Sequence, residues 1–172
     1  LTDVIALAVA DGAHVIGEPA LDLDEIAGIN DRSQLAAAEA ALRARRAADL
    51  MVEGAILADP ARIDVRGELR CGRDVFIDVG VVFEGEVTIG DGARLGPYCV
   101  INDSAIAPGA ELLAYSHLEG ANVGPAATVG RYGRLRPGAN LAARCKGGHC
   151  VEMKTRGVGG GGKVQQLRGV GA

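Results

Sequence analysis

A six-residue repeat constrains this chain more than any other feature of its sequence. The repeating apolar positions are Val65, Cys71, Ile77, Phe83, Ile89, Leu95 and Ile101. Each is followed four positions later by an apolar or small residue, namely Leu69, Val75, Val81, Val87, Ala93, Cys99 and Ala105. Turn-forming and charged residues lie between them. The pattern predicts a parallel β-helix, in which six residues supply one short inward-facing strand and one turn.

The repeat is interrupted after residue 101. The frame slips by one position at Ile106 and again at Val123. It then continues through Val129, Leu135, Leu141 and, less regularly, Gly147 and Met153. We expect loops or altered turns at the slips. The alternative is an antiparallel sandwich of short strands, but sandwiches seldom keep a strict six-residue frame. The pattern does not give the handedness of the helix, because parallel crossovers are ordinarily right-handed.

The composition agrees with a narrow, repetitive interior and argues against several classes of protein. The 172 residues include 26 glycines, no Trp and only 3 % aromatic residues. The formal net charge of -4 argues against nucleic acid as a partner, because binding to nucleic acid depends on a positive field. No apolar run approaches the roughly 20 residues that span a bilayer, and no secretory signal is present. We therefore expect a soluble, cytoplasmic protein without a membrane partner.

Residues 1–30 have the character of a small piece of an α/β domain. The sequence predicts a helix over 2–12 and a strand over 13–19. Two such elements cannot bury their own apolar faces. Because the chain also opens at Leu1 and not at Met, we expect an internal fragment whose α/β body lies upstream.

Residues 31–54 predict one long helix, since they are rich in Ala, Leu, Glu and Arg. Asp31 and Gln34 fit a capping box at its start, and Gly54 fits a stop at its end. Such a helix spans about 30 Å and can link two domains. The basic run that ends at Arg46 is expected to face solvent.

Three motifs along the chain resemble those of one enzyme family. They are LTDVIALA at the start, GINDRSQL before the long helix, and GRYGRLRPGANL within the hexads. The chain resembles, from Leu1 to about Lys146, the bifunctional N-acetylglucosamine-1-phosphate uridylyltransferase and glucosamine-1-phosphate N-acetyltransferase. The resemblance implies a mainly β fold, with a left-handed parallel β-helix acetyltransferase domain at 55–172 that is degenerate after about 147. A linker helix at 31–54 and the C-terminal end of an α/β uridylyltransferase domain at 1–30 would precede it.

The resemblance also implies two reactions and their reactants. Acetyl-CoA would acetylate the amine of glucosamine-1-phosphate in the β-helix domain. The product, N-acetylglucosamine-1-phosphate, would then react with UTP and Mg²⁺ in the α/β domain. The resulting UDP-N-acetylglucosamine feeds peptidoglycan and envelope polysaccharide synthesis. The family works as a homotrimer.

Asn30 matches the family asparagine that contacts Mg²⁺ and the nucleotide-sugar. A neutral amide oxygen suits Mg²⁺ when phosphates and a carboxylate supply the charge. The alternative is that Asn30 only caps the following helix.

Arg136 and Lys154 match the family cations that hold the sugar phosphate in the acetyltransferase site. The planar guanidinium of an arginine can bind two phosphate oxygens, while a lysine acts as a point charge. The alternative for Arg136 is a surface side chain on a β-helix turn.

The last part of the chain departs from the family pattern. Gln166 occupies the place of the family's general-base histidine, and Gly169 occupies that of a substrate-binding tyrosine. A glutamine amide cannot accept a proton from the attacking amine, so no intact catalytic residue is expected and the chain alone should be inactive. The sequence from Gly157 to Lys163 has P-loop spacing, but Val164 stands where a P-loop has Ser or Thr.

Two other functions remain open. A sugar nucleotidyltransferase could carry a non-catalytic β-helix that only forms trimers. The chain could also be a scaffold without enzymatic activity. Zinc binding by Cys145, His149 and Cys150 is disfavoured, because no fourth ligand completes the set.

Overall fold

The computed structural model describes residues 2–22, 25–153, 157–158 and 163–164. Two compact units divide the chain, Leu1–Ala41 and Leu42–Ala172, and their boundary falls within one helix. Neither of the two α-helices in the described residues has the length and apolar character that a membrane crossing requires.

The first unit contains a short helix and an extended segment. Helix α1 (Thr2–Ala10) confirms the helix predicted near the N-terminus, but none of its residues is buried. The strand predicted over 13–19 is wrong, because those residues form no strand. A strand needs a neighbour to pair with its backbone groups, and the described residues of this unit supply none.

Helix α2 (Arg32–Glu53) confirms the predicted long helix and both of its ends. The Gln34 N–H donates to Asp31 Oδ1 at 2.8 Å, and Gln34 Oε1 accepts from the Asn30 N–H at 2.6 Å. The return bond of the capping box thus reaches one residue further back than the usual motif. At the other end Gly54 has φ +110°, and the Ala55 N–H donates to the Leu50 carbonyl at 2.9 Å. These features make a glycine-terminated stop.

The last turns of α2 pack against the first turn of the β-helix. Ala47 and Leu50 are buried in the same apolar cluster as the β-helix core. The Arg46 guanidinium donates a hydrogen bond to the backbone carbonyl of Val65. The expectation that this arginine faces solvent is therefore wrong, because its guanidinium binds a backbone carbonyl of the first rung.

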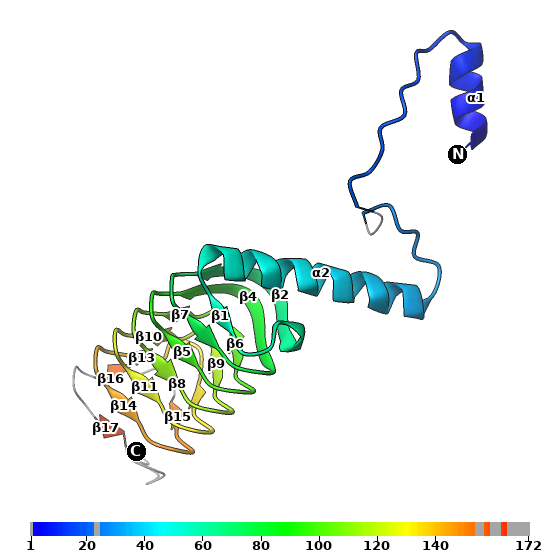
Figure 1. Ribbon diagram of the computed structural model, residues 1–172. Coiled ribbons are helices and arrows are strands. Elements are labelled where there is room, and N and C mark those ends of the chain that lie inside the picture. The colour runs from blue at the N-terminus through cyan, green and yellow to red at the C-terminus, as the bar shows by residue number, and fades with distance from the viewer. Residues whose placement is uncertain (1, 23–24, 154–156, 159–162, 165–172) are drawn as a thin grey trace. The chain divides into compact units, whose positions relative to one another are not determined.

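The second unit is a parallel β-helix whose strands form three flat faces (Figure 1). Face 1 contains β1 (Ile56–Leu57), β3 (Phe76–Ile77), β5 (Arg94–Leu95), β8 (Glu111–Leu112), β11 (Thr128–Val129), β14 (Lys146–Gly147) and β17 (Lys163–Val164). Face 2 contains the first halves of β2 (Ile63–Cys71) and β4 (Val81–Ile89), then β6 (Val100–Asn102), β9 (His117–Glu119), β12 (Arg134–Leu135) and β15 (Glu152–Met153). Face 3 contains the second halves of β2 and β4, then β7 (Ala105–Ile106), β10 (Asn122–Val123), β13 (Asn140–Leu141) and β16 (Gly157–Val158). A 3-10 turn, η2 (Pro60–Arg62), precedes β2.

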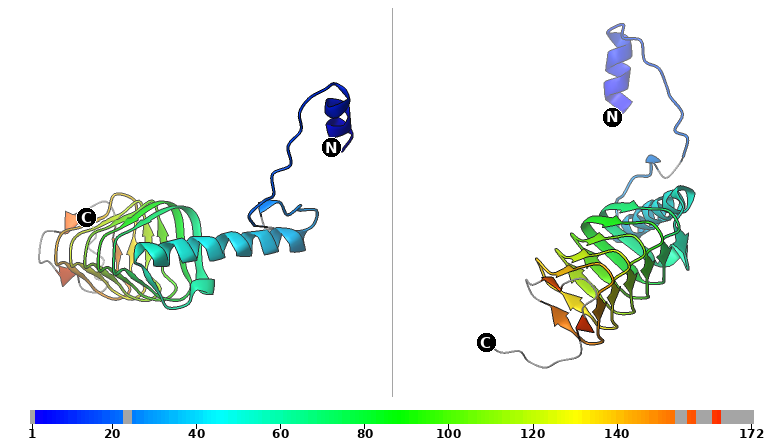
Figure 2. Two further views of the ribbon diagram at one scale, coloured as in Figure 1. Left: turned by 45° about the horizontal axis from the view of Figure 1, so that its top comes forward. Right: turned by 90° about the vertical axis from the view of Figure 1, so that its left-hand side faces the viewer.

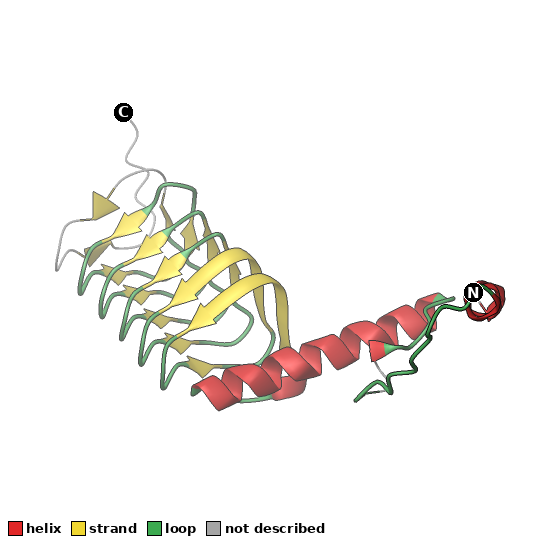
Figure 3. Cartoon of the chain, turned by 90° about the horizontal axis from the view of Figure 1, so that it is seen from above, coloured by secondary structure: helices red, strands yellow, loops and turns green. Residues whose placement is uncertain are grey.

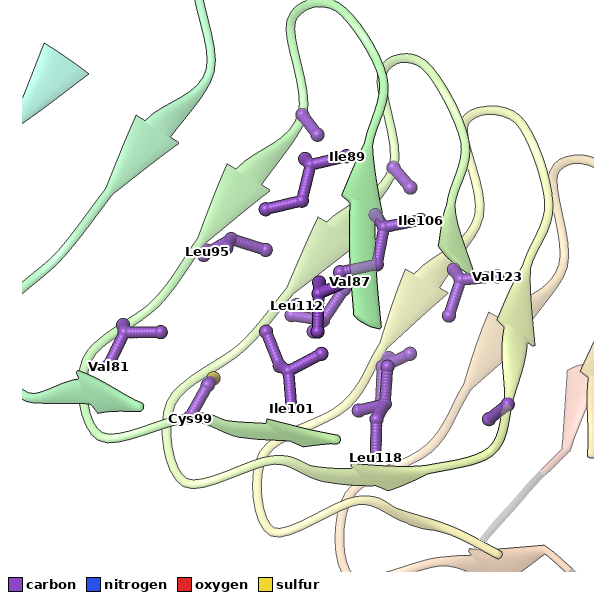
Figure 4. Packing of buried hydrophobic residues seen from close by; sticks show 14 of the residues in the cluster. Val81, Val87, Ile89, Leu95, Cys99, Ile101, Ile106, Leu112, Leu118 and Val123 are labelled. Atoms are coloured by element: carbon purple, nitrogen blue, oxygen red, sulfur yellow. The ribbon is translucent and has the colours of Figure 1, made fainter. Parts of the chain in front are cut away.

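Every strand of the β-helix pairs in parallel with the strand directly above or below it, and Figures 2 and 3 show the resulting stack of rungs. Side chains from all three faces meet inside the stack, as the labelled residues in Figure 4 show. Leu95, Ile101 and Leu118 are completely buried. The predicted parallel β-helix of hexapeptide repeats is therefore confirmed, while its left-handedness stays a prediction.

The core positions predicted on the first rung are only partly buried. They are Val65, Leu69 and Cys71, all on β2. Among the described strands, β2 pairs with β4 alone, so these side chains have a neighbouring rung on one side only.

The predicted core position at Ala105 is wrong, because Ser104 points inward in its place. Ser104 is 4 % exposed, whereas Ala105 is only partly buried. The corner between faces 2 and 3 is one residue shorter here: Phe76 pairs with Arg94 eighteen positions later, but Arg94 pairs with Glu111 after seventeen. Ser104 Oγ donates to the Asn102 carbonyl at 2.6 Å and accepts from the Ala121 N–H at 3.1 Å. Its hydroxyl therefore satisfies the backbone at the shortened corner.

One corner of the β-helix carries a ladder of stacked tyrosines. The ring centroids of Tyr98 and Tyr115 are 5.3 Å apart, and those of Tyr115 and Tyr132 are 5.0 Å apart. All three residues have positive φ, between 55° and 61°. Arg62 donates to the Tyr98 hydroxyl at 2.8 Å at one end of the ladder. The three tyrosines are the only ones in the chain and are spaced by seventeen residues, which is a signal that the sequence contained.

Candidate functional site

The outward side of face 2 brings charged residues of three successive rungs together. Strands β9, β12 and β15 each have one inward apolar residue, and Leu118, Leu135 and Met153 are paired in register. The residues that flank them therefore point outward. These outward residues are His117 and Glu119 on β9, Arg134 on β12, Arg136 directly after β12, and Glu152 on β15. We call this set the charged array.

Arg136 lies at the end of β12, immediately before a turn. Its backbone N–H donates to the Met153 carbonyl at 2.9 Å, which fixes the strand against the next rung. Gly138 follows with φ +82°, and its N–H donates to the Gly120 carbonyl at 2.9 Å. The Pro137–Gly138 turn therefore begins directly after Arg136, whose side chain is exposed on the outward side of face 2.

The Arg136 guanidinium has one partner in the array. Its Nη1 lies 3.4 Å from Glu152 Oε1, and the two side chains are 44 % and 43 % exposed. An ion pair this exposed is worth at most about 1 kcal/mol, so it can exchange for a phosphate. Because a guanidinium can bind two oxygens, Arg136 suits an anionic ligand on this face.

The other predicted site residues lie either in the first unit or outside the described residues. Asn30 lies in the first unit, where its backbone N–H is held by Gln34. Lys154, Gln166 and Gly169 lie outside the described residues. The P-loop-like spacing from Gly157 to Lys163 also lies mostly outside them.

The cysteines and histidines form no metal site within the part of the chain that the structure describes. Cys145 is buried in the core, Cys150 is exposed, and His149 Nδ1 accepts from the Arg131 N–H at 3.0 Å. Burial, with a smaller contribution from Glu53, raises the pKa of the Cys71 thiol to about 12. Burial also raises the pKa of Cys99 to about 11. These two thiols therefore remain protonated and unreactive at neutral pH.

A large groove on the β-helix does not coincide with the charged array. It crosses face 3, has a volume of about 560 Å³, and is lined by side chains that include Arg70, Thr88, Asn122 and Asn140. A second hollow of about 310 Å³ lies on face 1 around Phe76 and Arg94, whose guanidinium lies 4.8 Å from the Phe76 ring centroid. Neither groove presents the guanidinium of Arg136.

Comparison with known proteins matches both the repeats and the whole chain. Residues 70–103 match the family described as bacterial transferase hexapeptide, six repeats. Over 99 % of its length the chain is 51 % identical to the bifunctional protein GlmU of Bordetella parapertussis. It is 52 % identical over 97 % of its length to the bifunctional protein GlmU of Stutzerimonas stutzeri. Its relatives are the bifunctional GlmU proteins.

This match confirms the relationship predicted from the three motifs, including the transferase class of the relatives. The chain spans 37 % of the length of these two curated relatives.

Solved structures share the fold at low sequence identity. The acetyltransferase domain of PglB from Neisseria gonorrhoeae, in complex with acetyl coenzyme A, has a TM-score of 0.60 and 11 % identity, covering 74 % of this chain and 64 % of its own. A mutant of GDP-perosamine N-acetyltransferase from Caulobacter crescentus, in complex with CoA and GDP-perosamine, has a TM-score of 0.53 and 21 % identity. That match covers 74 % of this chain and 62 % of the other. At these identities the likeness shows the β-helix fold alone.

Proposed function

We propose that this chain is part of a bifunctional enzyme of UDP-N-acetylglucosamine biosynthesis and that its β-helix belongs to the N-acetyltransferase half. The observation that carries the proposal is the 51 % identity to a bifunctional GlmU over 99 % of the chain. That identity includes the α/β tail, the capped helix and the hexads in one continuous order. A non-catalytic solenoid would share only the hexads.

In this proposal Arg136 binds the phosphate of glucosamine-1-phosphate. The charged array offers an exposed guanidinium whose only ion-pair partner among the described residues is Glu152, at 3.4 Å. A phosphate dianion binds the Arg136 guanidinium more strongly than a single exposed carboxylate does. Lys154 would add a second cation. Acetyl-CoA would supply the acetyl group that the substrate amine attacks.

Asn30 belongs to the proposed uridylyltransferase half. Its amide oxygen would contribute one neutral ligand to Mg²⁺ beside the phosphates of UTP and the nucleotide-sugar. The described residues around it hold no cluster of carboxylates that could bind Mg²⁺ without the rest of that domain. We place the assembled enzyme in the cytoplasm as a homotrimer.

Chimeras with the Bordetella parapertussis relative test this proposal. One chimera carries the relative's own upstream sequence, residues 1–153 of this chain and the relative's own continuation, and a second carries residues 1–172 of this chain between the relative's flanking sequences. We expect the first to release CoA thiol from acetyl-CoA in the presence of glucosamine-1-phosphate. The second should be slower by about 10² to 10⁴, since Gln166 cannot act as a base, and Gln166→His should recover much of that loss.

Arg136→Ala in the first chimera tests the phosphate role. Loss of a charged hydrogen-bonding partner should reduce kcat/KM for acetyl transfer by about 10- to 100-fold. Pyrophosphate release from UTP and N-acetylglucosamine-1-phosphate should be unchanged. If the first chimera keeps that uridylyl transfer but has no acetyl transfer, the β-helix only assembles trimers and the alternative function holds.

A further inference from the structure

The charged array contains a second group that suits the proposed substrate. This inference rests on the proposed function and deepens it. An amino-sugar phosphate of the proposed class carries two opposite charges on adjacent carbons, a phosphate and an ammonium. A site that selects it over a simple sugar phosphate needs an anion placed beside the phosphate-binding cation.

Glu119 and Arg136 are neighbours across two rungs. Strands β9 and β12 are parallel, with His117 paired to Arg134 and Leu118 paired to Leu135. Glu119 is the last residue of β9 and Arg136 directly follows β12, so continuing this register by one position places the two residues beside each other. Both follow a buried leucine and are exposed on the same side. Neighbouring strands lie about 4.8 Å apart, which is comparable to the separation of a sugar 1-phosphate from a 2-amino group.

Glu119 differs from the other carboxylates on face 2 because they are engaged. Glu152 lies 3.4 Å from Arg136, and Glu84 lies 3.0 Å from Arg66. Within the described part of the chain, no hydrogen bond or ion pair holds the Glu119 carboxylate. Asn102, its neighbour on the preceding rung, is neutral. The Glu119 carboxylate is thus the available anion next to Arg136.

We propose that Glu119 is the residue that recognises the ammonium group of the amino-sugar phosphate while Arg136 binds its phosphate. The substrate then lies over the outward side of β9 and β12. Its ammonium group contacts one rung and its phosphate contacts the next. Glu119 sets specificity for the amine, and Arg136 supplies affinity common to all sugar phosphates.

Titrations of the 172-residue chain followed by NMR test this assignment. The probes are glucosamine-1-phosphate, glucose-1-phosphate and N-acetylglucosamine-1-phosphate, which share the phosphate but differ in the charge at carbon 2. We expect glucosamine-1-phosphate to bind about three- to fivefold more tightly than the two analogues that carry no charge at carbon 2; the preference is modest because the contact is exposed. Glu119→Gln should abolish this preference and leave the affinity for glucose-1-phosphate unchanged.

Two further variants separate the possible failures. Glu111→Gln is the matched control, since Glu111 also adjoins a buried leucine but lies on face 1, and it should leave the preference intact. Arg136→Gln should weaken all three sugars. If Arg136→Gln weakens binding but Glu119→Gln preserves the amine preference, the role of Glu119 is overturned and the proposed function stands. If none of the three sugars gives a saturable shift, or Arg136→Gln has no effect, the proposed phosphate site itself fails.

Discussion

The two ends of this chain contain similar apolar residues but use them differently. In the N-terminal segment, Leu7 is 65 % exposed and Ile16 is 76 % exposed. In the β-helix, Leu95 and Ile101 are completely buried. Each rung of the β-helix covers the apolar side chains of the next rung. The residues before α2, in contrast, have no neighbouring element that covers them within the described part of their unit. Apolar residues therefore stabilise the fold only where another part of the chain packs against them.

The largest expected difference comes from removing a buried ring. Phe83, on β4 between the rungs of β2 and β6, is 1 % exposed. Phe83→Ala should lower the free energy of unfolding by about 3–5 kcal/mol, because a cavity remains. Leu7→Ala is the control and should change it by less than about 0.5 kcal/mol. Urea unfolding followed by circular dichroism measures both free energies. Equal effects of the two substitutions would contradict the contrast between the two regions.

A single added methyl group should separate the two regions next. A Cβ at Gly124 would lie 2.6 Å from the Leu141 carbonyl oxygen on the next rung. Gly124→Ala should therefore cost about 1–3 kcal/mol through strain. At Gly17 no atom lies within 4 Å of the added Cβ, so Gly17→Ala should be neutral. Thermal unfolding distinguishes them, and a neutral Gly124→Ala would contradict the tight stacking of rungs.

The shortened corner offers a comparison within the β-helix. Ser104→Ala removes the acceptor for the Ala121 N–H and should cost about 1–3 kcal/mol, since that donor is left buried and unpaired. Ser33→Ala, on the exposed first turn of α2, is the control and should have a much smaller effect. An equal loss in chemical denaturation would mean that the Ser104 hydroxyl is not needed at the corner.

Thiol reactivity should show the smallest but most selective difference. Burial raises the pKa of Cys71 to about 12 and of Cys99 to about 11, from an ordinary 9.0. At pH 8.5 iodoacetamide should label exposed Cys150 first, with Cys71 and Cys99 reacting only after unfolding. The raised folded pKa also means that these thiols favour the folded state below pH 9, and that this stability is lost as pH rises toward 11–12. Mass spectrometry measures the labelling, and fast labelling of Cys99 in the folded chain would contradict the burial of that thiol.

The sequence predicts those features that depend on local chemistry or on strict repetition. Asp31 and Gly54 bound α2 because caps act within one turn, and the hexads give the β-helix because each repeat specifies the same inward position. The strand predicted over 13–19 was wrong because pairing is not a local property. The inward Ser104 was missed because the slip at Ile106 does not show which residue of the shortened corner points inward, and a hydroxyl is not an expected core group.

The site was only partly predictable for the same reason. Arg136 was identified from its motif, and the structure shows that its side chain is open and paired with Glu152. Glu119 could not be associated with it from the sequence, because seventeen residues separate them and only the register of β9 and β12 makes them neighbours. The roles of Lys154 and Gln166 stay predictions.

Hydrogen exchange of the folded 172-residue chain tests the central contrast most directly. We predict strong protection of the strand amides in the rungs between residues 75 and 141, since their N–H groups donate to carbonyls of adjacent rungs. Amides of residues 2–22 should exchange near the rate of an unfolded peptide, because α1 is short and none of its residues is buried. Comparable protection of both regions, or rapid exchange throughout the rungs, would contradict the account.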